Sequence, residues 1–187
     1  MDKVKNKPRV IPVKGSKDPI SDADKQIWDD FFKKIANNKD PSYFLVQEGK
    51  NWGRETAVLY LFAPDDDVWH HKMMKAVKKG DCIAHFVETK LMAISMVRTD
   101  CKKGFNPAGE EGLIVELDEL VLLDPQYDDD PSYLRWLYKK HTNEPFGPFD
   151  ENGYCKSAYY LSHLDSESWE GIYNFFQGRS DKLIHLF

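Results

Sequence analysis

Cysteine is scarce in this chain of 187 residues, and Cys82, Cys101 and Cys155 fall into no C-x-x-C pair. An odd number without that spacing argues against a disulfide framework and against a zinc knuckle. Three reduced thiols are typical of a cytoplasmic protein. No run of about 18 apolar residues is present, so no transmembrane helix is predicted. Residues 1–17 are polar and basic and lack the apolar segment of a secretory signal. We expect a cytoplasmic protein without a membrane partner.

Signatures of common enzymes are also missing. The sequence has no phosphate-cradling glycine loop, no G-x-S-x-G elbow and no H-E-x-x-H motif. His70 and His71 are adjacent, so on a helix they point about 100° apart and cannot share one metal ion. The acidic run at residues 128–130 precedes Pro131, where it suits a solvated helix N-terminus better than a magnesium site. No catalytic residue, metal ion or cofactor is predicted.

Apolar and aromatic residues, by contrast, are abundant. Hydrophobic residues make up 41% of the chain, with 11 Phe, 9 Tyr and 5 Trp. So many rings exclude a disordered chain. The length suits one domain with a substantial core.

Charge is unevenly distributed. The formal net charge is −5, yet residues 1–105 carry 20 basic and 15 acidic side chains, whereas residues 106–187 carry 6 and 16. Basic residues are densest over 69–105, with eight against three acidic ones. Such a face can meet nucleic-acid phosphates, although this pattern is more often only a solvated lysine-rich surface. The candidate phosphate contacts are Lys72, Lys75, Lys78, Lys79, Lys102 and Lys103.

The spacing of apolar residues predicts an α+β chain. Residues 1–20 hold three prolines and scattered lysines and are expected to form a basic arm. Residues 21–40 contain an amphipathic helix at 22–36 that packs on the following domain, residues 41–187. Strands are predicted at 43–47, 57–62, 82–87, 91–97, 113–122 and 158–161, and further helices at 70–77, 131–141 and 166–176. No strand–helix–strand rhythm repeats, so we expect a small mixed, mostly antiparallel sheet or barrel with peripheral helices.

Two tryptophans stand in polar surroundings. Trp52 lies in the polar loop 48–55, and Trp69 follows three aspartates at a predicted helix start. A ring in such a place either folds back onto the core or stacks on a flat ligand such as a flipped nucleobase. The nearby polar groups that could contact the edge of a base are Gln47, Asn51, His70 and His71.

Five short motifs follow one another in an order found in a known family. They are residues 46–50 with 54–55 and 60–64, residues 69–71, residues 77–86, residues 93–95, and residues 148–153 with 156–161. Together they resemble the EVE-like domains of the PUA superfamily, which are related to YTH domains. The resemblance spans about residues 43–164. Phe62 stands where relatives often carry Trp, and Ala158 where they usually carry Gly.

The resemblance implies a PUA-like barrel that accepts one modified, for example methylated, base between aromatic walls. Matched position by position, the implied pocket consists of Gln47, Gly49, Lys50, Trp52, Phe62, Ala63, Trp69 and His71. Because such domains occur in HNH-linked and methyl-directed restriction systems, it implies a non-catalytic module that binds modified DNA in restriction or phage defence. A partner would then supply nuclease or NTPase activity.

Three alternatives remain open at this stage. The first is an RNA reader of the same fold, because such a pocket sees the base and not the sugar. The second is a small nucleotide-processing enzyme that uses His70, His71 or His85. The third is a protein-interaction domain, suggested by the acidic second half of the chain.

Overall fold

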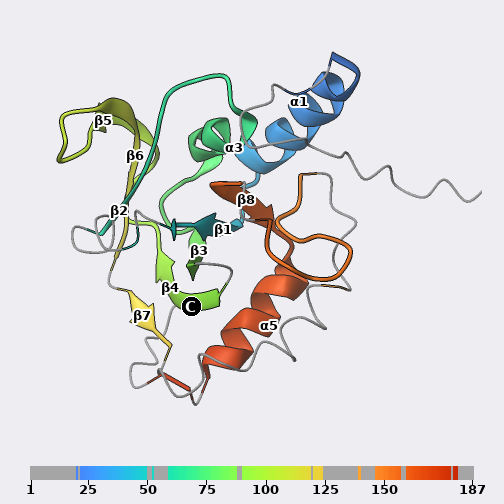
Figure 1. The fold of residues 1–187 in the computed structure, drawn as a ribbon, viewed down its shortest axis with the longest axis vertical. Coiled ribbons are helices and arrows are strands. Elements are labelled where there is room, and N and C mark those ends of the chain that lie inside the picture. Colours follow the sequence, from blue (N-terminus) through green and yellow to red (C-terminus); the bar gives the residue numbers. More distant parts are fainter. Residues whose placement is uncertain are drawn as a thin grey trace, which may run out of the picture.

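The fold is taken from a computed structural model. It describes residues 20, 22–49, 52, 59–87, 90–118, 120–123, 139, 146–156, 159–177 and 179–180. Two sheets lie at its centre, with helices at the periphery (Figure 1). The elements are α1 (Asp22–Ala36), β1 (Tyr43–Gln47), β2 (Tyr60–Ala63), α3 (Trp69–Lys72), η2 (Met73–Ala76, a 3₁₀ turn), β3 (Cys82–Val87), β4 (Lys90–Met96), β5 (Lys102–Phe105), β6 (Glu111–Glu116), β7 (Val121–Leu122), β8 (Leu161–Leu164) and α5 (Ser166–Phe176).

The larger sheet has the strand order β7-β4-β3-β1-β8. Only the pair β1–β3 is parallel, with Tyr43 opposite Cys82 and Gln47 opposite Phe86. The other pairs of this sheet are antiparallel. The connection from β1 to β3 contains β2, α3 and η2. This topology confirms the expected mixed, mostly antiparallel α+β fold.

The smaller sheet has the order β2-β6-β5, and both of its pairs are antiparallel. It meets the larger sheet at the bridge between Val97 and Leu117, where the Arg98 N–H donates to the Glu116 carbonyl at 2.8 Å. A barrel requires every strand to have two neighbours, but β2 and β8 each have one among the described strands. The expected closed barrel is therefore wrong for the described residues, which form two open sheets.

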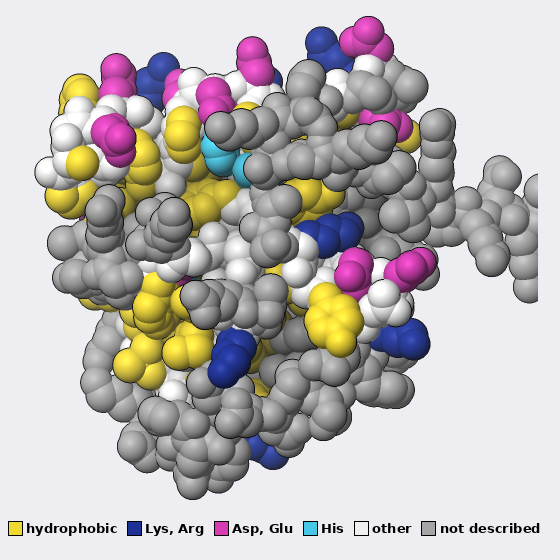
Figure 2. All heavy atoms as spheres, in the orientation of Figure 1, with side chains coloured by type: hydrophobic (Ala, Val, Ile, Leu, Met, Phe, Trp, Pro, Cys, Tyr) yellow, Lys and Arg dark blue, Asp and Glu magenta, His cyan; other side chains and the backbone are white. Residues whose placement is uncertain are grey.

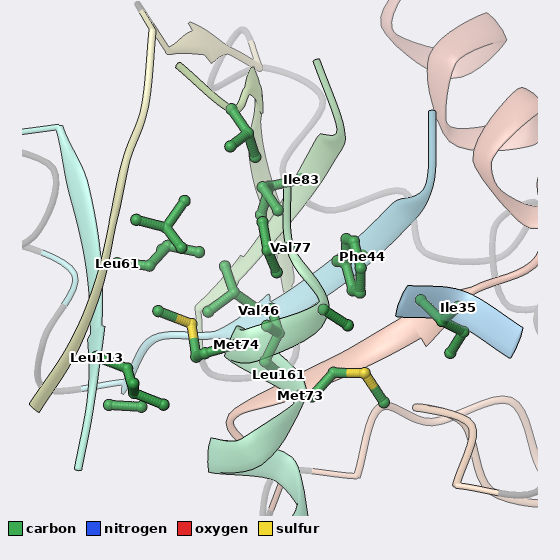
Figure 3. Close-up of a cluster of buried hydrophobic side chains, with 14 of the residues drawn as sticks. Ile35, Phe44, Val46, Leu61, Met73, Met74, Val77, Ile83, Leu113 and Leu161 are labelled. Carbon is green, nitrogen blue, oxygen red and sulfur yellow. The ribbon is translucent and has the colours of Figure 1, made fainter. Parts of the chain in front are cut away.

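Side chains on the two faces of the larger sheet enter different cores. Phe44 and Val46 of β1 pack into a cluster with the smaller sheet, α1 and α3, whereas Leu45 packs beneath α5. This division follows from the strand itself, because successive side chains point to opposite faces. Figure 3 shows the first cluster, in which side chains from α1, the strands of both sheets and η2 point toward one another.

The two long helices have the bounds expected from the sequence. In α1 the apolar face buries Trp28 and Ile35. In α5 the carboxylate of Asp165 caps the first turn by accepting from the Ser168 N–H at 2.8 Å. The helix expected at 131–141, apart from Lys139, and the arm, apart from Ile20, lie outside the described residues. No helix in the described part of the chain is both long and apolar enough to cross a membrane.

Candidate base-binding site

Tyr160, immediately before β8, joins the elements that carry the predicted site residues. Its carbonyl accepts from the Gln47 N–H at 2.8 Å, its hydroxyl accepts from the Phe62 N–H at 3.0 Å, and its own N–H donates to His70 Nδ1 at 3.2 Å. These bonds connect the end of β1, the edge strand β2 and helix α3. Tyr160 is not among the site residues predicted from the sequence, although it stands in the last motif of the resemblance.

His71 presents a partly exposed imidazole beside Tyr160. Its side chain is 20% exposed, and its ring centroid lies 6.3 Å from that of Tyr160 at an interplanar angle of 75°. The Nδ1 atom lies 2.9 Å from Oδ1 of Asp66, an oxygen that also accepts from the Val68 N–H at 3.0 Å. The ring is thus held in one orientation at the surface. Figure 2 shows histidine side chains at the surface beside hydrophobic ones.

Phe62 and Ala63 point to opposite faces of the smaller sheet. Ala63 is 1% exposed and belongs to the core, whereas Phe62 is only partly buried. The Phe62 ring lies over Gly112, where a Cβ atom would be 2.7 Å from ring atoms and 2.5 Å from the Ala63 carbonyl oxygen. A common pocket floor formed by Phe62 and Ala63 was expected from the sequence. The structure contradicts this expectation, because the two side chains lie on opposite faces of the sheet.

Trp52 is partly buried and contacts the larger sheet. Its N–H donates to the Glu48 carbonyl at 3.2 Å, and its ring centroid lies 6.0 Å from that of His85 at 60°. It is absent from both hydrophobic core clusters. Of the neighbouring loop, Gly49 is described and adopts a positive φ of 33°, whereas Lys50 lies outside the described residues.

Beneath Trp52 lies a buried triad that the sequence analysis did not predict, formed by Glu48, His85 and Ser95. His85 Nε2 is 2.7 Å from Ser95 Oγ, and His85 Nδ1 is 3.1 Å from Glu48 Oε1. The order of groups is that of a serine–histidine–acid catalytic triad. However, His85 and Ser95 are 0% exposed and Glu48 is 2% exposed, so no substrate reaches them in this conformation. We assign the buried triad a structural role at the end of β1.

Gln47 faces away from Trp52. Its Oε1 atom accepts from the Cys155 thiol at 3.0 Å, in the core that lies beneath α5. Burial raises the pKa of Cys155 to about 12, so the thiol keeps its proton and remains a donor. Because side chains alternate along β1, the Gln47 amide and the Glu48 carboxylate lie on opposite faces. The structure thus does not bring the Gln47 side chain to the Trp52 side of the sheet.

Trp69 is a core residue and not an exposed wall. It is 1% exposed, and its ring lies 4.6 Å from Tyr159, 5.4 Å from Trp28 and 5.2 Å from Phe146. These contacts join α1, α3 and the segment before β8. Of the two possibilities that the sequence left open for this ring, packing onto the core is the one observed, and the expected pocket wall at Trp69 is not accessible.

The basic face carries its own counter-ions. Asp65 binds Lys75 at 2.6 Å and Lys103 at 2.8 Å, and these two partners, Lys103 first, lower the pKa of Asp65 to about 2. The remaining pairs are Lys72 with Asp67 at 2.7 Å, Lys102 with Glu116 at 2.6 Å, and the Lys78 ammonium with the Asn38 carbonyl. Within the described residues only Lys79, among the six candidates, has an ammonium without such a partner. Acidic and basic side chains accordingly alternate along the upper edge of Figure 2.

No cluster of three or more His, Cys, Asp or Glu side chains with metal-binding geometry occurs among the described residues. Cys82 and Cys155 are buried free thiols, and burial raises the pKa of Cys82 to about 12. A thiol with so high a pKa is a poor nucleophile. The exposed chemistry of the described site is therefore that of rings, an imidazole and paired lysines.

Comparison with known proteins adds little. No family model matches the sequence, and no curated protein matches it significantly. A solved structure with a similar arrangement is the NMR structure of Rpa0253 from Rhodopseudomonas palustris. It has a TM-score of 0.40 and 11% identity over 77% of this chain and 96% of that one.

Proposed function

We propose that this protein is a non-catalytic nucleic-acid-binding module of the EVE-like, PUA-superfamily kind that recognises a modified base, in DNA in preference to RNA. The observation that carries the proposal is the partly exposed edge formed by His71 and Tyr160, with ring centroids 6.3 Å apart and the imidazole fixed by Asp66. A flat ligand needs a π surface together with polar groups in fixed positions. This edge supplies both beside the lysines of α3 and η2.

Trp52 is the second ring in this proposal. It is partly exposed, and its ring packs at 60° against that of His85. Stacking of a base on an aromatic side chain contributes about 1–3 kcal/mol and tolerates every base, because every base has a π face. In this proposal Trp52 supplies affinity, whereas the polar groups near His71 supply selectivity.

The paired lysines fit a weak, salt-dependent contact with phosphates. Solvent screens exposed ion pairs such as Lys72–Asp67, so a phosphate can replace the carboxylate at little cost. Lys79 needs no such exchange. Any nuclease or NTPase activity lies on a partner, as in restriction or phage-defence systems, and a cytoplasmic location belongs to the same proposal.

The test is a titration of the full chain with labelled DNA and RNA strands and DNA duplexes, with and without methylated adenine or cytosine, at two salt concentrations. We expect tighter binding to one modified DNA, and a loss of about 5- to 150-fold in Trp52→Ala, the equivalent of 1–3 kcal/mol. The control is Phe105→Ala, a change of a 66% exposed ring on β5. Equal affinity for modified and unmodified strands contradicts the proposal, and preference for modified RNA shifts it to an RNA reader.

A further inference from the structure

Which ring nitrogen of His71 carries the proton determines which bases the site can accept. Asp66 Oδ1 lies 2.9 Å from His71 Nδ1 and also accepts from the Val68 N–H. An ionised carboxylate is an acceptor only, so the Nδ1 atom of a neutral imidazole must carry the proton. The Nε2 atom of His71 is then an acceptor.

This acceptor is open and its direction is fixed. In the described part of the chain Nε2 of His71 has no hydrogen-bond partner, and the side chain is 20% exposed. The ring is confined by two edge-on neighbours, His70 at 4.6 Å and 85° and Tyr160 at 6.3 Å and 75°. Asp66 holds the opposite corner of the ring, so the lone pair keeps one orientation.

His70 has the opposite pattern. Its Nδ1 atom accepts from the Tyr160 N–H at 3.2 Å, so its proton lies on Nε2, and it is only 3% exposed. The two adjacent histidines therefore differ in tautomer and in exposure. Of these two histidines, only His71 offers a ring acceptor at the surface, which separates a ligand-facing role from a structural one.

We propose that His71 makes this site selective for bases whose exocyclic amino group keeps at least one N–H, an inference that rests on the proposed function. Adenine and cytosine present an amino donor where thymine and uracil present a carbonyl oxygen. When a base carbonyl faces Nε2, both atoms are hydrogen-bond acceptors and neither has a donor. Such an unsatisfied group costs a multiple of what a good hydrogen bond contributes.

Methylation sharpens the distinction. N6-methyladenine, N4-methylcytosine and 5-methylcytosine each keep an amino N–H, so each can donate to Nε2. N6,N6-dimethyladenine has no N–H left, although it offers more apolar surface than N6-methyladenine. Hydrophobic burial alone thus predicts tighter binding of the dimethylated base, whereas the hydrogen bond to His71 predicts weaker binding. The two explanations therefore predict opposite changes in affinity from N6-methyladenine to N6,N6-dimethyladenine.

The experiment measures the affinity of the full chain for single-stranded DNA 12-mers that differ at one central position. The bases compared are adenine, N6-methyladenine, N6,N6-dimethyladenine, cytosine, 5-methylcytosine and thymine. We expect N6,N6-dimethyladenine and thymine to bind about tenfold more weakly than N6-methyladenine. In His71→Phe, which keeps a ring but removes the acceptor, this difference should disappear. Asp66→Ala should reduce it, and Asp67→Ala, whose carboxylate pairs with Lys72, should leave it unchanged.

The outcomes separate the two proposals. If a modified base is preferred but the dimethylated base binds as well as the monomethylated one, the role of His71 is overturned and the proposed function stands. The same holds if His71→Phe keeps the wild-type discrimination. If modified and unmodified strands bind with equal affinity, the proposed function is overturned and this inference falls with it. Urea unfolding of each variant establishes that it is folded.

Discussion

The Nε2 atom of His85 lies 2.7 Å from the Oγ atom of Ser95, and neither side chain is exposed to solvent. The bond joins the adjacent strands β3 and β4. The other ring nitrogen of His85 faces Glu48, at the point where the chain leaves β1 for the loop that carries Trp52. Because buried polar groups are costly when unpaired, the hydrogen bond between His85 and Ser95 holds in place the imidazole against which Trp52 packs.

Ser95→Ala tests that support. The substitution leaves His85 Nε2 buried without a partner, which should lower the free energy of unfolding by about 1–3 kcal/mol. Urea denaturation measures the loss. Ser166→Ala at the exposed start of α5 is the control and should stay within about 0.5 kcal/mol of the wild type. Equal effects of the two changes would show that the buried hydrogen bond contributes nothing.

Trp69→Ala should destabilise the protein strongly, because Trp69 packs against Trp28, Phe146 and Tyr159 in the core. Removal of a buried Trp costs about 3–5 kcal/mol. The matched change Phe105→Ala, on a ring that is 66% exposed, should cost far less. Thermal and urea unfolding of both variants provide the comparison. If Trp69→Ala barely changed the free energy of unfolding, Trp69 would fit the pocket wall expected from the sequence better than a core residue.

Gly112→Ala should be destabilising by about 1–3 kcal/mol through overpacking. Its Cβ atom would lie 2.5 Å from the Ala63 carbonyl oxygen and 2.7 Å from the Phe62 ring, so β2 or Phe62 must move. Gly104 is the partner of Gly112 in the β5–β6 pair and provides the control. There the nearest atoms to an added Cβ all belong to the Ile114 side chain, with Cδ1 closest at 3.0 Å, and none is a backbone atom. If Gly104→Ala costs as much, the contact with Phe62 is not the cause.

Asp65 should contribute to the acid dependence of stability. Lys103 and Lys75 lower its pKa from the ordinary value of 3.8 to about 2 in the folded protein. A carboxyl group with a lowered pKa stabilises the fold above its unfolded value and loses that contribution as pH falls through the folded value. Asp65→Asn should therefore flatten the pH dependence of unfolding between about pH 4 and pH 2, and leave its shape above pH 5 unchanged. Parallel curves for the two proteins across the acid range would contradict this.

The same residue should restrain nucleic-acid binding. Asp65→Asn removes the carboxylate that Lys75 and Lys103 now share, which frees two ammonium groups for phosphates. We expect tighter binding to all sequences alike and a steeper fall of log affinity with log salt, by about one unit for each lysine that gains a phosphate. Asp118→Asn, at an exposed position after β6, is the control for a simple change of net charge. Similar slopes for both variants would mean that Lys75 and Lys103 do not contact phosphate.

The sequence by itself determined the elements whose signal is local. The bounds of α1, β1, β3 and α5 match the expected ranges because each carries its own apolar period or cap. The strand β5 was not predicted, since Lys102–Phe105 is polar and exposed and becomes a strand only by pairing with β6. The expected strand at 113–122 divides into β6 and β7 because each half pairs with a different sheet.

The site depended on tertiary structure to a greater extent. Composition and spacing placed His71 and Trp52 among the candidates. Only the fold shows that the side chains of Gln47 and Glu48 lie on opposite faces of the sheet and that Trp69 is buried against α1. Only the fold pairs the lysines with Asp65 and Asp67. Neither Tyr160 nor the buried triad was predicted from the sequence, and the reason is the same. Their partners lie between 10 residues (Ser95 from His85) and 113 residues (Gln47 from Tyr160) away along the chain. Contacts at that separation are set by strand register and sheet packing, which no local pattern of residue types encodes.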